Sequence, residues 1–397
     1  SVNAKGLREL ADSLFSKRGQ YMSLLQEIAE QLYPERADFT VTRNLGDDFG
    51  AHLSSSYPPL CRRDLGDQIG TMLRPTQKAW FHMVPRDSGI ADNSSKRWLQ
   101  WAEGQQRRAM YDTDALFTKA AKQGDHDFAS FGGLVMSIQL NRTRAHLLYN
   151  TWHIRDVVWR ENQDGQIDFK ARKIKMALTD VLAYFPRGDI DQKIRDRAKK
   201  EPFADLEMMH IVCEMELYTG DFSRAYNTEP GMQDAGYQSR ARIKKRVSLY
   251  YDCENNRAIE TTAIWGKFYI IPRWVTVAGS QYPYSPATIV ALPEARLLQA
   301  MTLTLLEAGE KAVNPPLVAT KDVVKSDMQM WPGGVTWVDA EYDERLGAAL
   351  RALEIDTKGL PINLEMVKDS RGVLQQCFFL NKLRAFNPNT DPQMTAF

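Results

Sequence analysis

The 397-residue chain has little cysteine, and what it has is scattered: Cys61, Cys213, Cys253 and Cys377. No CxxC pair or regular spacing occurs, which excludes a disulfide-stapled fold and favours free thiols in a reducing compartment. No run approaches the roughly 18 apolar residues of a membrane span, and the opening segment does not have the pattern of a signal peptide. We therefore expect a protein made in a cytoplasm, with no membrane among its partners.

The chain also lacks an excess of either charge, because 51 lysine and arginine residues stand against 50 aspartate and glutamate residues. A net charge of +1 excludes a generally basic nucleic-acid coat and an acidic disordered tail. Hydrophobic residues at 43% and charged residues at 25% are ordinary values for a chain that folds, and the length allows two or three packed units. Any charged partner must therefore be met by a local patch.

Motifs for common catalytic and nucleotide sites are absent from the sequence. There is no GxxxxGK[ST] phosphate loop, HExxH zinc motif, GxSxG nucleophile motif or GxGxxG dinucleotide motif. Asp125, His126 and Asp127 could offer metal ligands, but adjacent side chains point in different directions, so a solvated helix end is the preferred interpretation. His210 is interpreted as a strand histidine. We therefore expect a protein that is not an enzyme and has no catalytic, cofactor-binding or metal-binding residues.

Hydrophobic spacing predicts helices in the first third of the chain and strands in the middle. Residues 7–32 keep helical spacing until Pro34 and predict one long amphipathic helix. Further helices are expected over 58–73 and 95–121. Short β-prone runs follow at 134–140, 208–218, 247–253 and 268–277. The expected fold class is mixed α+β and predominantly helical.

The last third predicts two long helices that bracket a small α/β insert. Ser285 and Pro286 supply an N-cap and a first-turn proline, and the helix runs to Val313 before Asn314-Pro315-Pro316 ends it. The second helix is expected over 364–386. On pattern alone, an ordinary core hairpin of a globular protein is an equal alternative. An apolar seam along the first helix suits packing against another helix: Leu298, Met301, Leu305, Ala308 and Ala312.

Basic residues gather in three clusters, at 170–175, 193–200 and 240–246. Such runs are usually solvated faces. Only the last is dense enough to suggest phosphate contact or pairing between subunits. It comprises Arg240, Arg242, Lys244, Lys245 and Arg246.

A set of motifs in fixed order carries a resemblance to a known family. The strongest block comprises Tyr282-Pro283-Tyr284-Ser285-Pro286, Ala291-Leu292-Pro293 and Lys311-Ala312-Val313-Asn314-Pro315-Pro316-Leu317. Weaker matches precede it: Leu73-Arg74-Pro75 with Trp80-Phe81, Met209-His210-Ile211-Val212 and Ile271-Pro272-Arg273-Trp274. Together these motifs resemble the portal, or head-to-tail connecting, proteins of short-tailed double-stranded DNA phages, over most of the chain.

The resemblance implies a dodecameric ring with a central channel at one capsid vertex, used for genome packaging, retention and ejection. By position it assigns a domain to each part of the chain: 1–284 to a wing, 285–313 to an outward stem helix, 314–362 to an α/β clip, 363–386 to a returning stem helix and 387–397 to the start of a channel loop. Met394-Thr395-Ala396-Phe397 resembles the start of a family motif that leads into a crown, so a crown is either absent or outside this sequence.

The implied partners are identical subunits in the ring, double-stranded DNA in the channel, the terminase large subunit, the major capsid or scaffolding protein, and a tail adaptor protein. The protein would be made in the host bacterial cytoplasm and lie in the virion. Two rival functions remain: another phage adaptor or scaffold-type ring protein, and a metal-dependent enzyme that processes nucleic acid.

DNA contact is expected at the turn after the returning stem helix, where Asn and Pro stop the helix. The candidate residues are Lys382, Arg384, Asn387 and Asn389. By the resemblance, this loop narrows the channel, so a modest basic pair on each subunit becomes a girdle of positive charge. An equal alternative is that Lys382 and Arg384 only interact with the dipole at the helix C-terminus.

Overall fold

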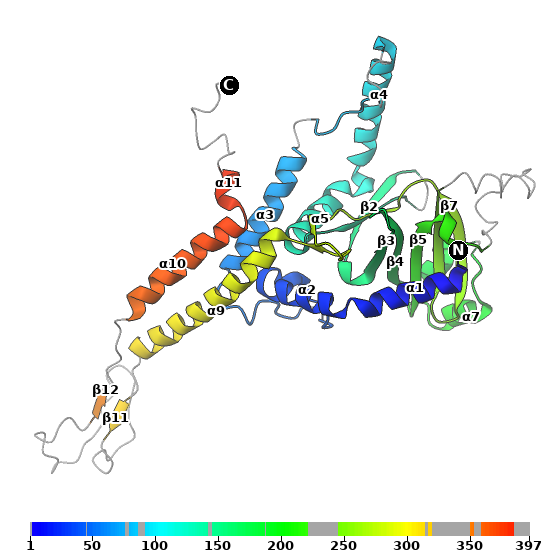
Figure 1. The fold of residues 1–397 in the computed structure, drawn as a ribbon. Coiled ribbons are helices and arrows are strands. Elements are labelled where there is room, and N and C mark those ends of the chain that lie inside the picture. The colour runs from blue at the N-terminus through cyan, green and yellow to red at the C-terminus, as the bar shows by residue number, and fades with distance from the viewer. Residues whose placement is uncertain are drawn as a thin grey trace, which may run out of the picture.

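The computed structural model describes residues 2–44, 46–75, 79–85, 92–141, 145–186, 188–220, 245–313, 317–319, 350–352 and 359–384. Within these ranges the fold is mixed, with more helix than strand, as the sequence predicts. Figure 1 shows a body that contains most of the strands, a pair of long helices that extend from it, and one further helix that projects separately; the two short strands at 317–319 and 350–352 lie beyond the far ends of the long pair.

The opening segment forms two helices, α1 (Ala4–Lys17) and α2 (Gly19–Leu32), so the prediction of one long helix is wrong. The chain breaks at Arg18, which is only 4% exposed. Its guanidinium donates hydrogen bonds to the backbone oxygens of Ile154 (2.9 Å) and Val157 (2.6 Å). Because these acceptors lie more than a hundred residues away in sequence, helical periodicity could not reveal the contact that fixes Arg18.

Replacing Arg18 tests this anchor. Burial lowers the pKa of the Arg18 guanidinium to about 10, so the group is still charged at neutral pH. We expect Arg18→Ala to lower the free energy of unfolding by about 3 kcal/mol, because buried carbonyl groups lose their donor. Lys17→Ala, on the exposed side of the same turn, is the control. Equal denaturant midpoints for the two variants would contradict the assignment.

Three helices follow: α3 (Tyr57–Leu73), α4 (Asn93–Met110) and α5 (Phe117–Phe131). The first agrees with the prediction, but the single helix predicted over 95–121 is wrong. The Asp112 carboxylate accepts a hydrogen bond from the backbone nitrogen of Asp114 (3.0 Å), which favours a turn over continued helix. Leu116 then takes a left-handed backbone with a φ of 55°. These two local conformations separate α4 from α5.

A five-stranded antiparallel sheet has its strands in chain order: β3 (Val157–Glu161), β4 (Ile167–Ala177), β5 (Asp205–Glu214), β6 (Arg246–Asp252) and β7 (Arg257–Ile264). Side chains of β5 alternate between its two faces. Met209 and Ile211 pack with α1, whereas Leu206 and Met208 pack with α6 (Leu178–Tyr184) and α7 (Gln192–Lys200). Helices therefore cover both faces of the sheet.

The remaining strands are short: β1 (Val135–Leu140), β2 (Leu147–Trp152) and β8 (Tyr269–Ile270) in one sheet, β9 (Val275–Thr276) with β10 (Pro283–Tyr284), and β11 (Leu317–Ala319) with β12 (Leu350–Ala352). The strand predictions at 134–140 and 247–253 are confirmed. The run at 208–218 is β5 only as far as Glu214 and then becomes a 3₁₀ turn, and the run at 268–277 is divided between β8 and β9.

The last described helices are α9 (Pro286–Val313), α10 (Gly359–Cys377) and α11 (Leu380–Arg384). α9 begins where the sequence predicts, but the second helix begins earlier and is not continuous. Phe379 interrupts it with a φ of 58°. Phe378 and Leu380 are both buried in the main core, and an unbroken helix would point residues two apart to nearly opposite sides. The turn at Phe379 lets both side chains enter the core.

By length and composition alone, α9 is apolar enough to cross a membrane, so the prediction that no segment approaches such a composition is wrong. One side of α9, however, lies in the main core, where Ala291, Ala295 and Leu298 are fully buried. Arg296 also forms an ion pair with Glu27 of α2. The apolar composition of α9 therefore has a cause within the protein: it includes the residues that pack this helix into the core.

Candidate assembly surfaces and channel residues

The start of α9 is joined to the end of α5 by buried hydroxyl groups. Ser285 Oγ donates a hydrogen bond to the backbone oxygen of Ala129 (2.7 Å) and accepts one from the backbone nitrogen of Thr288 (3.4 Å). Thr288 Oγ1 donates to the backbone oxygen of Ser130 (2.7 Å). Ser285 thus caps α9 and binds α5 at once, so the motif around it fixes the direction in which the long helix leaves the body.

A close backbone approach at Gly132 completes this joint. Gly132 has a φ of 72°, and a Cβ atom there would collide with the carbonyl group of Tyr284. Tyr21 also holds this strand, because its hydroxyl donates a hydrogen bond to the backbone oxygen of Pro283 (2.8 Å). Burial raises the pKa of the Tyr21 hydroxyl far above its usual value, so the hydroxyl is protonated and can donate at neutral pH.

Two glycine substitutions separate this contact from ordinary backbone strain. Gly165 also has a φ of 72°, but nothing lies within 4 Å of a Cβ built there. We expect Gly165→Ala to cost about 1–2 kcal/mol, from the left-handed backbone alone. Gly132→Ala should cost more than about 3 kcal/mol or leave no soluble protein, because overlap is added to strain. If chemical denaturation gave equal losses of unfolding free energy for the two variants, the close approach at Gly132 would not contribute to stability.

The two long helices α9 and α10 lie side by side beyond this joint (Figure 1). Of the predicted seam on α9, Leu298 and Met301 lie in the same core as residues of α10, and Leu305 packs against that core. Ala308 is half-buried and Ala312 is exposed. The structure therefore brings together the part of the seam nearest the body and leaves its far end uncovered by the described residues.

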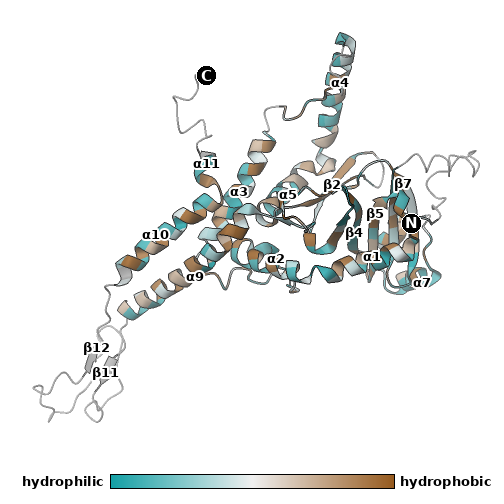
Figure 2. Ribbon diagram, viewed as in Figure 1, coloured by the Kyte–Doolittle hydropathy of each residue, from teal (hydrophilic) through white to brown (hydrophobic). Residues whose placement is uncertain are grey.

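Other apolar residues of this helix pair face solvent. On α9 they lie opposite the seam, and on α10 three of them recur on one side, as expected from helical spacing. Figure 2 shows hydrophobic and hydrophilic residues mixed along both helices. Exposed apolar groups collected in this way mark surfaces for association. We call this set the outer hairpin surface: Leu303, Leu306, Val313, Ile362, Met366 and Val373.

Asp125, His126 and Asp127 of α5 do not gather as ligands for a metal, and the preferred interpretation of this run as a solvated helix end is wrong. Asp125 and Asp127 are buried, and each pairs with a separate arginine: Asp125 with Arg74, and Asp127 with Arg36 (2.9 Å). His126 Nδ1 lies 3.1 Å from the Arg62 guanidinium. Burial and the charge of Arg62 lower the pKa of His126, which favours its neutral form. The triple therefore ties α5 to neighbouring segments.

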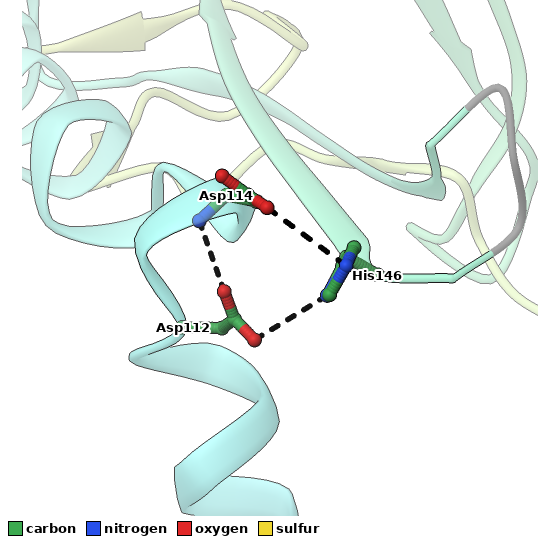
Figure 3. A group of neighbouring side chains, drawn as sticks. All are labelled: Asp112, Asp114 and His146. Carbon is green, nitrogen blue, oxygen red and sulfur yellow. Dashed lines mark hydrogen bonds and ion pairs between the residues drawn. The ribbon is translucent and has the colours of Figure 1, made fainter.

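The structure brings together another group that the sequence analysis missed, Asp112, Asp114 and His146 (Figure 3). His146 Nδ1 lies 3.3 Å from an Asp112 oxygen, and Nε2 lies 3.8 Å from an Asp114 oxygen. The Asp-x-Asp spacing was visible, but nothing in the sequence pointed to His146. Both carboxylates are exposed. This arrangement is that of a surface ion pair which joins the turn after α4 to the start of β2.

His210 is a strand histidine, as predicted. It is fully buried in β5, where its ring nitrogens lie 2.7 Å from the Tyr269 hydroxyl and 2.8 Å from Ser248 Oγ. Its ring also stacks on Tyr250, with centroids 4.1 Å apart. Burial, assisted by the charge of Arg172, holds the pKa of His210 well below its usual value, so the ring is neutral. Its role is to join strands, with no free ring nitrogen for chemistry.

Comparison with known proteins identifies the family of the chain. A family model described as bacteriophage head to tail connecting protein matches residues 4–397. The chain belongs to this family. A curated relative named probable portal protein, from Bordetella phage BPP-1, is 22% identical over 388 residues, which cover 96% of this chain and 66% of the relative. The chain thus spans about two thirds of that relative's length. The family is one of structural connectors and not of enzymes, as predicted.

The predicted DNA-channel residues of this connector lie at or beyond the end of α11. Lys382 is exposed, and its Nζ lies 5.9 Å from the centroid of the Phe379 ring, within cation–π range. Arg384 is the last residue of α11. Asn387 and Asn389 lie outside the described residues.

The basic clusters of the connector have different surroundings. Of the densest, Arg240, Arg242 and Lys244 lie outside the described residues. Arg246 forms an ion pair with Glu214 across β5 and β6 (2.9 Å), so this residue holds neighbouring strands together. In the 170–175 cluster Lys170 is buried, and its ammonium donates to the backbone oxygen of Tyr269 (2.9 Å). Burial lowers the pKa of Lys170 to about 8. Because Lys170 is buried, the interpretation of this run as a solvated face is wrong at that residue.

Proposed function

We propose that this connector is a portal protein: identical copies form a ring, by family resemblance a dodecamer, around a channel for double-stranded DNA at one capsid vertex. The observation that carries the proposal is the outer hairpin surface, which leaves apolar residues of both long helices exposed on a single chain. Membership of the head-to-tail connector family and the name of the Bordetella phage relative support it.

The distribution of the outer hairpin surface permits the head-to-tail contacts of a ring. Its residues lie on two different helices, α9 and α10, so one copy can present its α9 side to the α10 side of the next. Contacts between unlike surfaces are head-to-tail, and they close into a ring when the rotation permits. Leu303 and Leu306 are about half exposed on one chain, so completing the burial of each in such a contact contributes about 1 kcal/mol. That contribution repeats at every subunit boundary.

In this proposal the α9–α10 pair is the stem, 314–362 is the clip and 1–284 is the wing, with the channel loop beginning at 387. The terminase large subunit packages the genome through the ring, the capsid or scaffolding protein surrounds the wing, and a tail adaptor protein binds the clip. The protein is made in the host cytoplasm, is incorporated at the vertex of the virion, and retains the genome until ejection.

Charged substitutions on α9 test ring formation. Leu303 and Leu306 are about half exposed on one chain, so Leu303→Glu/Leu306→Glu should preserve the fold while placing two carboxylates at each boundary. We expect monomers by native mass measurement and no rings by electron microscopy, whereas the unmodified chain forms rings with a central hole. Phe203→Glu is the control, because Phe203 is 85% exposed and lies before β5. Normal rings from the double variant, or a stable monomer of the unmodified chain at micromolar concentration, would refute the proposal.

The channel assignment has its own test, in which Lys382 and Arg384 are changed together to glutamine. We expect intact rings, because the exposed Lys382 makes no ion pair with any described residue. Fewer particles should retain the genome, and retention should depend less on salt, since each subunit loses two cations. Lys193→Gln/Lys200→Gln on the exposed side of α7 removes the same charge elsewhere. Unchanged retention would limit Lys382 and Arg384 to helix capping.

A further inference from the structure

The helix α4 projects from the body (Figure 1), and among the described residues the side-chain contacts to it come along one side. Met110 is buried at its C-terminal end, and Glu103 accepts a hydrogen bond from the backbone nitrogen of Met83 (3.2 Å). The Arg107 guanidinium lies over the Phe81 ring, 5.4 Å from its centroid. Residues 103, 107 and 110 share one side of a helix. That side faces the segment 79–85.

The opposite side of α4 carries two tryptophans that are exposed to solvent. Trp98 is 62% exposed and Trp101 is 60% exposed, and their spacing of three residues places them side by side. Gln105 follows on the same side, and the exposed Arg97 and Arg108 lie along one edge of that side. Neither arginine forms an ion pair within the part of the chain that the structure describes. We call this set the α4 tryptophan face: Trp98, Trp101, Gln105, Arg97 and Arg108.

A face of this composition is suited to a protein partner. Tryptophan and arginine are the residues that most often dominate the binding energy of protein interfaces, because they combine a large apolar area with fixed polar groups. A solitary helix of this length is also marginal in water unless something packs against it. The N-terminal half of α4, which includes both tryptophans, has no buried residue to supply that packing.

The charges on the face decide the chemistry of the partner. Two unpaired arginines beside the tryptophans favour carboxylates at the edge of an apolar contact. Double-stranded DNA would satisfy the arginines through its phosphates, but its backbone would leave two large indole rings in water. An acidic amphipathic helix satisfies both parts, since its apolar ridge can cover the indoles while its carboxylates reach the guanidinium groups.

We propose that the α4 tryptophan face binds an acidic amphipathic helix of another protein. The apolar ridge of that helix packs on Trp98 and Trp101, and its carboxylates pair with Arg97 and Arg108. All of these residues belong to one chain, so the inference does not depend on ring formation. A failure of rings to assemble and a failure of this face to bind are therefore separate results.

The test uses the full chain and two synthetic helical peptides of about 20 residues, each about 30 Å long. Both carry the same leucine ridge, and the other positions are glutamate in one peptide and lysine in the second. Fluorescence anisotropy of the labelled peptides, and of a labelled DNA duplex of similar length, measures binding at several salt concentrations. We expect the glutamate peptide to bind, more weakly at high salt, and to bind more tightly than either alternative probe.

Two variants and two matched controls locate the binding on α4. Trp98→Ala/Trp101→Ala and Arg97→Glu/Arg108→Glu should each weaken binding of the glutamate peptide by about tenfold or more. Trp265→Ala, at a tryptophan that is 61% exposed elsewhere, and Lys193→Glu/Lys200→Glu on α7 should change it by less than about twofold. Circular dichroism checks that every variant is folded.

Three results would overturn the proposal: no binding of the glutamate peptide, equal losses in the control variants, or equal binding of the lysine peptide. Binding of the duplex in preference to the glutamate peptide, lost in Arg97→Glu/Arg108→Glu, would identify the face as a DNA contact instead. Because both substitution pairs change exposed side chains, loss of binding by a folded variant is assigned to the face itself.

Discussion

The joint between the end of α5 and the start of α9 is the constraint on which the rest of the molecule depends. The hydroxyls of Ser285 and Thr288 bind carbonyl groups that α5 leaves free at its C-terminal end. Gly132 permits the two backbones to touch. Since α9 is a single helix of 28 residues, a small change of angle at this joint would displace its far end by many ångströms. Buried hydrogen bonds therefore define where the long helices point.

The long helices are apolar on two sides for two different reasons. Leu298 and Met301 are buried in the core of one chain, whereas Leu303 and Leu306 on the opposite side of α9 stay about half exposed. A single chain thus buries only part of the apolar side chains of its long helices. Exposure of the apolar residues of the outer hairpin surface to water is unfavourable, and association of that surface would remove this free-energy cost. This division explains how one helix can resemble a membrane span in composition and yet pack one of its sides into a protein core.

The sequence predicts features that depend on local pattern and misses those that depend on distant contacts. The N-cap at Ser285 and the strands β1 and β6 follow from residue order alone, and the family follows from motifs in fixed order. The breaks at Arg18 and Phe379 do not, because each is set by burial against segments far away in sequence. Burial of Lys170 within β4 is hidden for the same reason. The exposed apolar stripes also need a structure, since periodicity cannot tell a core face from an assembly face.

Charged side chains also differ between the interior and the surface of the chain. Asp125 and Asp127 of α5 are each paired with an arginine of the same chain. Removing one member of such a pair would leave a buried, unpaired charge. These contacts therefore fix how α5 packs against the segments that carry Arg36 and Arg74. Arg97 and Arg108 on α4 have no such partner among the described residues, and they lie beside uncovered tryptophans. A net charge of +1 conceals this contrast, because paired internal ions cancel in the sum. The charges available to a partner are those that have no ion-pair partner among the described residues. On α4 these charges are basic, and they lie beside exposed tryptophans.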